Sequence, residues 1–146
     1  MAPADARLPV LVVEDSDDDY DTIVEGARRA GVPNPLVHAP DAAVARARLG
    51  EPHAYAFVLL DHNLPGTDGL DLLAELRALP GRATLPVVVF TTSGSARDCA
   101  AFYRAGANAY HVKSVRFDEC IDTLQAVFGY WLRRVALPPA PSRSSR

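Results

Sequence analysis

Residues 8–31 read LPVLVVEDSDDDYDTIVEGARRAG, and this stretch indicates the kind of fold to expect. Its first part, Leu8–Val13, is a short apolar run rich in β-branched residues, which is typical of a strand buried on both faces. Its second part, Asp17–Ala30, has the pattern of a helix and ends at Gly31. We therefore expect a strand followed directly by a helix, with acidic residues in the turn between them.

The same strand–helix pattern repeats along the chain. Further strands are predicted at Leu36–His38, Ala54–Leu60, Pro86–Phe90 and Ala109–Val112. The helices that follow are predicted at Asp41–Leu49, Leu70–Leu79, Ser95–Ala105 and Phe117 to about Ala136. Because parallel strands need right-handed crossover connections, these units imply a parallel sheet with helices on both faces. The expected fold is α/β, with a doubly wound five-stranded parallel sheet flanked by five helices, the last of them extended.

The chain has the size and composition of one domain. It has 146 residues, 49% of them hydrophobic, and we place the folded domain at residues 8–137, with flexible ends at 1–7 and 138–146. A formal net charge of −3 gives no case for nucleic-acid binding, which needs a dense basic face. There is no apolar leader and no apolar run of membrane length, so we expect a cytoplasmic protein. Cys99 and Cys120 lack metal-type spacing and are expected to be free thiols.

Residues that can do chemistry stand where the predicted strands end. Glu14 and Asp15 follow the first strand, Asp61 the third, Thr91 the fourth and Lys113 the fifth. In doubly wound sheets, ligands bind just beyond the carboxyl ends of the strands. If these strands are neighbours, the residues converge on one pocket with carboxylates, a hydroxyl and an ammonium group.

Such a pocket suits a divalent cation and phosphoryl chemistry. Two carboxylates about 4 Å apart repel by about 4 kcal/mol at an effective dielectric of about 20, and a hard cation relieves this repulsion. An all-oxygen site suits Mg²⁺. A metal-bound carboxylate can act as nucleophile toward a phosphoryl group, which forms an aspartyl phosphate. Lys113 and the Thr91 hydroxyl would then bind the phosphoryl oxygens.

Purely structural roles also fit several polar residues of the chain, including the acidic pair after the first strand. Acidic residues at the start of a helix favour its dipole, and this interpretation stays open for Glu14 and Asp15. Ser16 is the expected N-cap, facing Asp19. We expect three acids to be solvated first-turn residues, namely Asp17, Asp18 and Asp19. The histidines have no metal-type spacing and are expected at the surface or in loops: His38, His53, His62 and His111.

Lys113 is the only lysine of the chain, and every other residue among the 15 Lys and Arg is an arginine. An arginine does not replace a lysine where a compact charge is needed on a flexible stem. A single lysine at a strand end therefore favours a specific function for its ammonium group.

Residues from about Leu8 to Phe128 resemble the receiver domain of two-component response regulators. The resemblance rests on an acidic pair after the first strand, an Asp-x-x-x-Pro-Gly-x-x-Gly loop after the third, a Thr after the fourth and a Lys after the fifth. It implies the flavodoxin-like strand order 2-1-3-4-5. It also implies a phosphoacceptor signalling protein rather than an enzyme, which takes a phosphoryl group from a sensor histidine kinase with Mg²⁺, or Mn²⁺ as a substitute, and then switches a protein-interaction face.

By position, the resemblance implies a role for each matching residue. Asp61 corresponds to the phosphoacceptor, Thr91 to the switch hydroxyl, Lys113 to the phosphoryl-binding ammonium and Tyr110 to the aromatic switch. The implied metal ligands are Glu14, Asp15, Asp61 and the backbone carbonyl of Asn63. Two positions tune the lifetime of the phosphorylated state in the family, and this chain has Asn63 and Ser93 there.

The chain departs from the family pattern at two positions. Ser114 stands where the family usually has a proline with a cis peptide bond, and without proline that bond costs about 3 kcal/mol, so its geometry is left open. Thr92 replaces a very small residue and narrows access to Asp61. The Lys-Ser pair and two C-terminal segments resemble a subset, the single-domain regulators that partner phytochrome-type histidine kinases; these segments are Tyr130-Trp131-Leu132 and Leu137-Pro138-Pro139. The implied partner is a bacteriophytochrome.

Three other functions fit the sequence less well. A binding module that needs no phosphorylation is disfavoured by the intact set of acidic, hydroxyl and ammonium residues. A phosphohydrolase with Asp61 as nucleophile usually has a second acid two residues later, where this chain has Asn63. A flavin-binding protein would need a Ser/Thr/Gly-rich phosphate loop, and no loop offers one.

The last helix has more apolar residues than one packed face requires. One stripe, such as Ile121, Leu124, Phe128 and Leu132, would face the sheet. A second stripe would face outward: Cys120, Val127, Trp131 and Val135. With Tyr130 added, it predicts a homodimer interface formed by Val127, Tyr130, Trp131 and Val135. The alternative is that Trp131 folds back over the edge of the core.

Overall fold

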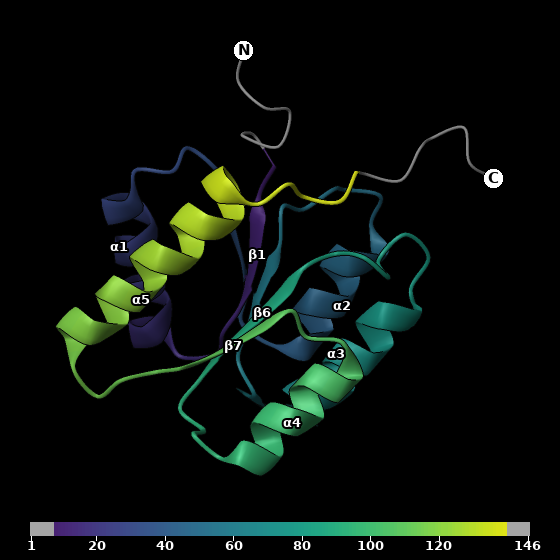
Figure 1. The fold of residues 1–146 in the computed structure, drawn as a ribbon. Coiled ribbons are helices and arrows are strands. Elements are labelled where there is room, and N and C mark those ends of the chain that lie inside the picture. The colour runs from purple at the N-terminus through teal and green to yellow at the C-terminus, as the bar shows by residue number, and fades with distance from the viewer. Residues whose placement is uncertain (1–7, 140–146) are drawn as a thin grey trace.

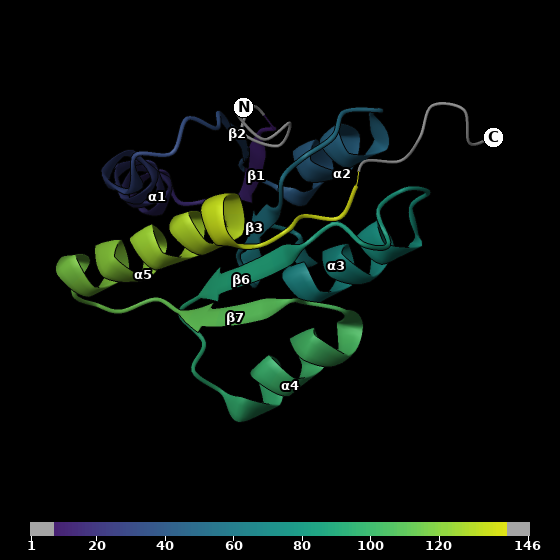
Figure 2. The ribbon, with the colours of Figure 1, turned by 45° about the horizontal axis from the view of Figure 1, so that its top comes forward.

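The computed structural model describes residues 8–139, and its centre is a five-stranded parallel sheet (Figures 1 and 2). The strands are β1 (Val10–Val13), β2 (Leu36–Ala39), β3 (Val58–Leu60), β6 (Val87–Thr91) and β7 (Ala109–Val112). They lie in the order β2-β1-β3-β6-β7, and each pairing is parallel. The predicted order is therefore confirmed, since the third, fourth and fifth predicted strands are β3, β6 and β7.

Helices cover both faces of this sheet. The helices are α1 (Asp17–Ala30), α2 (Ala42–Gly50), α3 (Gly69–Ala78), α4 (Ala96–Ala105) and α5 (Phe117–Gly129). Figure 2 shows α1 and α5 side by side on one face and α2, α3 and α4 on the other. The Ser16 hydroxyl accepts a hydrogen bond from the Asp19 amide, so the predicted cap of α1 is confirmed.

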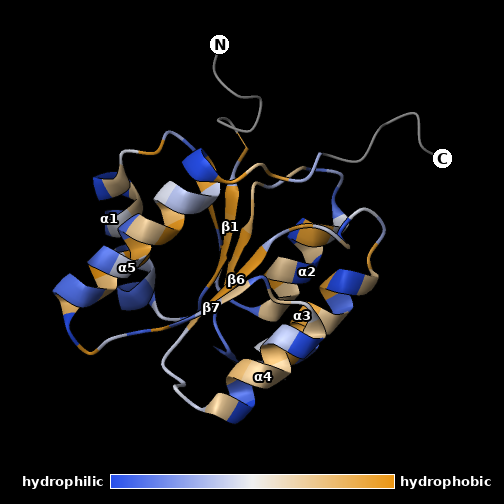
Figure 3. Cartoon of the chain, viewed as in Figure 1, coloured by the Kyte–Doolittle hydropathy of each residue, from blue (hydrophilic) through white to orange (hydrophobic). Residues whose placement is uncertain are grey.

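Each central strand sends alternate side chains into two separate hydrophobic clusters. Leu11 and Val13 of β1 belong to the cluster under α2, α3 and α4, whereas Val10 and Val12 belong to the cluster under α1 and α5. Both faces of the three central strands, β1, β3 and β6, are buried, which explains why these strands are apolar up to their ends (Figure 3). Within residues 8–139, no helix is both long and apolar enough to cross a membrane.

The loop after β3 contains a small hairpin that has no counterpart among the predicted elements. In it, β4 (Asn63–Leu64) pairs antiparallel with β5 (Thr67–Asp68), and Gly66 takes a positive φ of 74° in the turn. A Cβ on Gly69 would lie 2.5 Å from the Asp61 carbonyl oxygen. Glycine at both positions therefore lets the loop turn tightly beside Asp61.

The C-terminal segment corrects the predicted outward stripe. α5 ends at Gly129 and continues as a wider π-helical turn, η2 (Tyr130–Arg134), instead of reaching Ala136 as a regular helix. Val127 and Cys120 are buried in the core of their own chain. Trp131 is half-buried, with its ring centroid 6.2 Å from that of Phe57, so it caps the edge of the core.

The outward stripe was wrong because α5 packs against α1 as well as against the sheet (Figure 1). A helix with two neighbours needs apolar residues over a wider arc than a helix with one. Of the four residues predicted for a dimer interface, Tyr130 is exposed and Val135 is half-buried.

Most of the predicted flexible ends lies outside the described residues, namely residues 1–7 and 140–146. Pro138 and Pro139 are described. Together with Leu8, they line a cavity of about 40 Å³ at the opposite end of the sheet from Asp61. The boundary of the folded domain at residue 137 stays a prediction.

Replacing Gly26 by Ala should destabilise the fold by about 1–3 kcal/mol, because the added methyl group overpacks the α1–α5 contact. A Cβ at this position would lie 2.5 Å from the Leu124 Cβ, an atom that can move away only together with the α5 backbone. Gly129→Ala is the matched control, since Gly129 is helical and has no atom within 4 Å of such a Cβ. It should be neutral or stabilise by up to about 1 kcal/mol. Urea unfolding of both variants tests this, and equal stabilities would contradict the packing argument.

Candidate functional site

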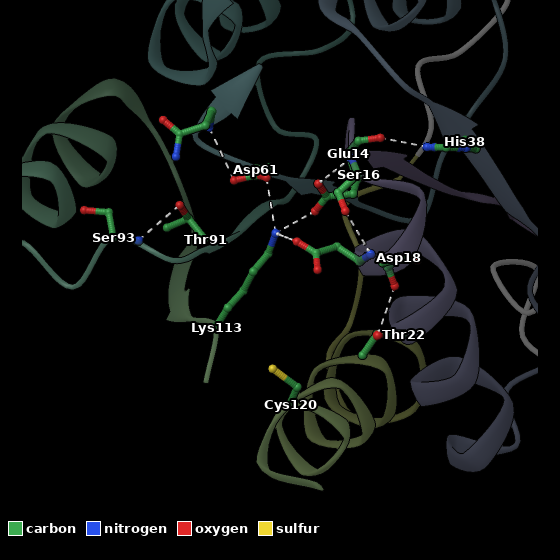
Figure 4. A network of polar contacts seen from close by, with 12 residues as sticks. Glu14, Ser16, Asp18, Thr22, His38, Asp61, Thr91, Ser93, Lys113 and Cys120 are labelled. Carbon is green, nitrogen blue, oxygen red and sulfur yellow. Dashed lines mark hydrogen bonds and ion pairs between the residues drawn. The ribbon is translucent and has the colours of Figure 1, made fainter. Parts of the chain in front are cut away.

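The carboxyl ends of four neighbouring strands bring the predicted residues together. Glu14 follows β1, Asp61 follows β3, Thr91 closes β6 and Lys113 follows β7. The Lys113 ammonium donates to Glu14 Oε1 at 2.7 Å and to Asp61 Oδ2 at 3.2 Å. Figure 4 shows the Lys113 side chain pointing between these two carboxylates. One lysine thus links the ends of three strands.

The acidic residues have an arrangement that fits a divalent cation. One carboxylate oxygen from each of Glu14, Asp15 and Asp61 lies within 4.8 Å of the others. Glu14 and Asp61 are buried, whereas Asp15 is exposed, so the cluster opens to solvent on one side. Hard oxygen ligands with room for water are what Mg²⁺ prefers. The backbone amide of Asn63 donates to Asp61 Oδ1 at 3.3 Å. That the backbone carbonyl of Asn63 is a further metal ligand stays a prediction.

Burial and charge shift the pKa values of this cluster in a defined direction. Burial raises the pKa of Glu14 from 4.5 to about 7, an effect that the hydrogen bond from Lys113 reduces and the charge of Asp61 increases. For Lys113, burial alone would lower the pKa, but the hydrogen bonds to Asp19 and Glu14 and the charge of Asp61 outweigh it. The pKa of Lys113 is therefore raised, and its ammonium stays charged.

The affinity for Mg²⁺ should rise with pH up to about 7 and then level off. Because the pKa of Glu14 is raised, protonation of Glu14 stabilises the metal-free fold. This contribution to the stability of the fold is complete below about pH 4.5 and is lost as the pH rises through about 7. A cation needs the deprotonated form, so each pH unit below about 7 weakens binding by up to about tenfold. Calorimetric titrations with Mg²⁺ between about pH 5.5 and 8 measure this. Glu14→Gln should bind more weakly and lose most of the pH dependence; a parent affinity that is flat across the range would contradict the argument.

Asp19 belongs to the site, although it was predicted to be a solvated first-turn residue. Its Oδ2 accepts a hydrogen bond from Lys113 Nζ at 2.8 Å. The prediction for Asp17 and Asp18 is confirmed, since both are exposed. No local signal in the sequence separates Asp19 from these two neighbours, because its partner Lys113 lies 94 residues further along the chain.

Thr91, Ser93 and Tyr110 form a second group beside the acidic cluster. Thr91 is fully buried, and its hydroxyl accepts a hydrogen bond from the Ser93 amide at 3.4 Å. The Tyr110 hydroxyl donates to the Ser93 carbonyl at 2.9 Å, and its ring packs against Phe102. The Ser93 hydroxyl donates to Asp98 of α4 at 2.6 Å. The loop after β6 is thereby tied to both the edge strand and α4.

Two histidines are more embedded than predicted. The His38 ring stacks on Tyr20 with 3.8 Å between the centroids, and its Nε2 lies 2.7 Å from the Glu14 carbonyl oxygen. His62 lies in a loop as expected, but its side chain is largely buried and meets the edge of Phe102. His38 lies within β2 and His62 follows β3, and each ring is covered by an aromatic side chain of a neighbouring helix, Tyr20 of α1 or Phe102 of α4.

The Lys113–Ser114 peptide bond is trans, as are all peptide bonds within residues 8–139. The cis geometry typical of the family does not occur here, because a bond without proline strongly prefers trans. Ser114 instead organises the turn through its hydroxyl, which donates to Glu119 and accepts from the Arg116 amide.

Comparisons with known proteins agree with this geometry. The family model of the response regulator receiver domain matches residues 10–125. The response regulator Rcp1 of Synechocystis is 34% identical over 137 residues, which cover 90% of this chain and 93% of Rcp1. A crystal structure of the Mn²⁺-bound form of Rcp1 covers 90% of this chain and 99% of its own, with a TM-score of 0.84 and 33% identity.

Two further solved structures have similar folds and somewhat lower sequence identity. The phosphorylated cyanobacterial phytochrome response regulator RcpA has a TM-score of 0.85 and 29% identity, and the match covers 91% of this chain and 99% of RcpA. A response regulator in red light signalling of R. palustris has a TM-score of 0.81 and 29% identity, with the same coverage of both chains.

Proposed function

This chain belongs to the response regulator receiver family, and we propose that it accepts a phosphoryl group on Asp61 from a sensor histidine kinase. The observation that carries the proposal is the contact of one buried ammonium, that of Lys113, with Asp61 and Glu14 in a cluster fit for a cation. A carboxylate, a cation site and a fixed positive charge together are what phosphoryl transfer to a protein needs.

Each side chain of the cluster has a role in the proposed transfer step. Asp61 attacks the phosphorus of a phosphohistidine in line, the P–N bond breaks, and the imidazole of the kinase leaves. Mg²⁺, or Mn²⁺ in its place, would be held by Glu14, Asp15, Asp61 and the Asn63 carbonyl, and would neutralise charge on the phosphoryl oxygens. Lys113 and Thr91 bind these oxygens from the β7 and β6 sides. The chain thus promotes its own phosphorylation and dephosphorylation and is not an enzyme acting on other substrates.

Signalling would proceed through Thr91 and Tyr110. When Thr91 moves toward the phosphoryl group, the loop after β6 moves with it, because the Ser93 amide is hydrogen-bonded to the Thr91 hydroxyl. Tyr110 and Asp98 hold the same loop, so the shift reaches β7 and α4. Phosphorylation then biases an equilibrium between two forms of the face made by α4, β7 and α5.

The proposed partner is a phytochrome-type histidine kinase, a bacteriophytochrome. Support comes from RcpA, which is a phytochrome response regulator, and from the R. palustris protein, which acts in red light signalling. Phosphotransfer from a panel of purified histidine kinases tests this pairing. We expect the phytochrome-type kinase to label the chain within the shortest time, and faster labelling by unrelated kinases would refute the pairing. A cytoplasmic location stays a prediction.

We further propose a homodimer through the end of α5 and β7. A groove of about 450 Å³ lies there, with His111, Val127, Tyr130 and Trp131 in its wall. Tyr130 is 52% exposed beside it, and burial of such a ring stabilises an interface. Trp131 is a poor probe, because it supports its own core.

Sedimentation at micromolar concentration should show a dimer that Tyr130→Ser weakens by about tenfold, as expected for loss of a large interface side chain. Val24→Ser on α1 is the control, since Val24 is exposed on another part of the surface. A parent protein that sediments as a monomer would exclude the dimer.

A further inference from the structure

The Lys113 ammonium has three hydrogen-bond donors, and three carboxylates accept from it. They are Glu14 at 2.7 Å, Asp19 at 2.8 Å and Asp61 at 3.2 Å. The Lys113 side chain is only 6% exposed, whereas that of Asp19 is 44% exposed at the rim of the site. Asp19 differs from the other two acceptors in one respect: it lies outside the group of carboxylates that can share a cation.

A cation would compete with Lys113 for two of these three acceptors. Glu14 and Asp61 belong to the cation cluster, so their oxygens and charge would be shared with the metal ion. The ion would also repel the ammonium, since both are positive. Asp19 is the acceptor that such an ion leaves free. Without it, nothing on the α1 side would hold Lys113 near Asp61 once the cation had bound.

We propose that Asp19 is a positioning residue, which keeps the Lys113 ammonium beside Asp61 while a divalent cation occupies the acidic cluster. This inference rests on the proposed phosphoryl transfer to Asp61. Asp19 does not touch the phosphoryl group; it acts through Lys113, whose ammonium must meet the phosphoryl oxygens during transfer.

The local structure of α1 supports this role. Asp19 is in the first turn, and its backbone amide is fixed by the hydroxyl of the N-cap Ser16 at 3.2 Å. The cap sets the start of the helix, and Asp19 thereby points toward the end of β7. The two preceding acids, Asp17 and Asp18, are of the same type but exposed, so position alone separates Asp19 from them.

These neighbours supply a matched experiment. Asp19→Asn and Asp18→Asn each remove one negative charge from the same helical turn, but only the first weakens a contact with Lys113. The rate of Asp61 phosphorylation is measured with acetyl phosphate at saturating Mg²⁺. We expect Asp19→Asn to lower the maximal rate by about tenfold, as for loss of a hydrogen bond between charged groups, and Asp18→Asn by less than about twofold. Asp19→Glu should restore part of the rate.

A double-mutant cycle shows whether Asp19 acts through Lys113. In a Lys113→Ala background, Asp19→Asn should cause no further loss. Three results would overturn the proposal: equal effects of Asp19→Asn and Asp18→Asn, a full Asp19→Asn effect in the absence of Lys113, or recovery of the parent rate by additional Mg²⁺. The last would mean that Asp19 only raises cation affinity. If the parent chain takes no phosphoryl group at all, the proposed function fails instead, which is a separate outcome.

Discussion

Asp61→Asn should abolish phosphorylation by acetyl phosphate or by a phosphorylated histidine kinase. The amide of Asn is not a nucleophile at phosphorus, so no acyl phosphate can form. The substitution also removes one of the carboxylates in the cation cluster and an acceptor of Lys113. Both effects act in the same direction, and no residual label is expected at this residue.

The measurement is uptake of radiolabelled phosphoryl groups with Mg²⁺, with Mn²⁺ and with EDTA. The parent should be labelled with either cation and not with EDTA. Asp71→Asn is the control, because Asp71 is an exposed acid in the first turn of α3 and should leave uptake unchanged. Label of parental strength in EDTA, or in the Asp61→Asn variant, would refute the mechanism.

Lys113→Arg should lower the rate of phosphorylation by about a hundredfold although it keeps the positive charge, because a displacement of about 1 Å at a reacting centre has effects of this size. The ammonium directs three hydrogen bonds from one nitrogen to Glu14, Asp19 and Asp61. A guanidinium spreads its donors over a plane and is broader, so it cannot reproduce this convergence in a buried space.

Arg116→Lys is the matched control, because it makes the opposite exchange, from arginine to lysine, at an exposed position three residues after Lys113. It should leave phosphorylation unchanged. The melting temperatures of both variants should be recorded, because a rate lost together with the fold would say nothing about Lys113. A folded Lys113→Arg variant that is labelled as fast as the parent would show that charge alone is sufficient.

Most of the fold could be predicted from the sequence, because the three central strands are buried on both faces. Runs such as Val10–Val13 and Val87–Thr91 are apolar at every position before their ends. Such strands are typical of a parallel sheet covered by helices on both faces, so the pattern predicts an α/β fold. The candidate site followed from the same topology. Once the strands are parallel and adjacent, Glu14, Asp61 and Lys113 must meet at one edge, although 99 residues separate the first from the last.

Features that depend on contacts between distant elements could not be predicted. Nothing local distinguishes Asp19 from Asp18, and the difference arises only when β7 brings Lys113 to the end of α1. The burial of Val127 depends on how α5 packs, and the apolar pattern of the helix alone also fitted an exposed stripe. The Lys113–Ser114 bond, in contrast, is determined locally. It is trans because a cis bond without proline is costly, although the family pattern has a cis bond at this position.

The solitary lysine gives amine-directed reagents a single internal target, and that target lies in the candidate site. Apart from the α-amino group of the chain, Lys113 has the only primary amine, so an acylating or reductively alkylating reagent has one internal target. Reaction needs the neutral, exposed amine, and both burial and three ionic partners oppose this in the resting protein. The extent of modification, read by intact mass, would therefore report how often the pocket opens. Kinase binding, cation binding and phosphorylation could each be followed by this covalent reporter without any engineered label.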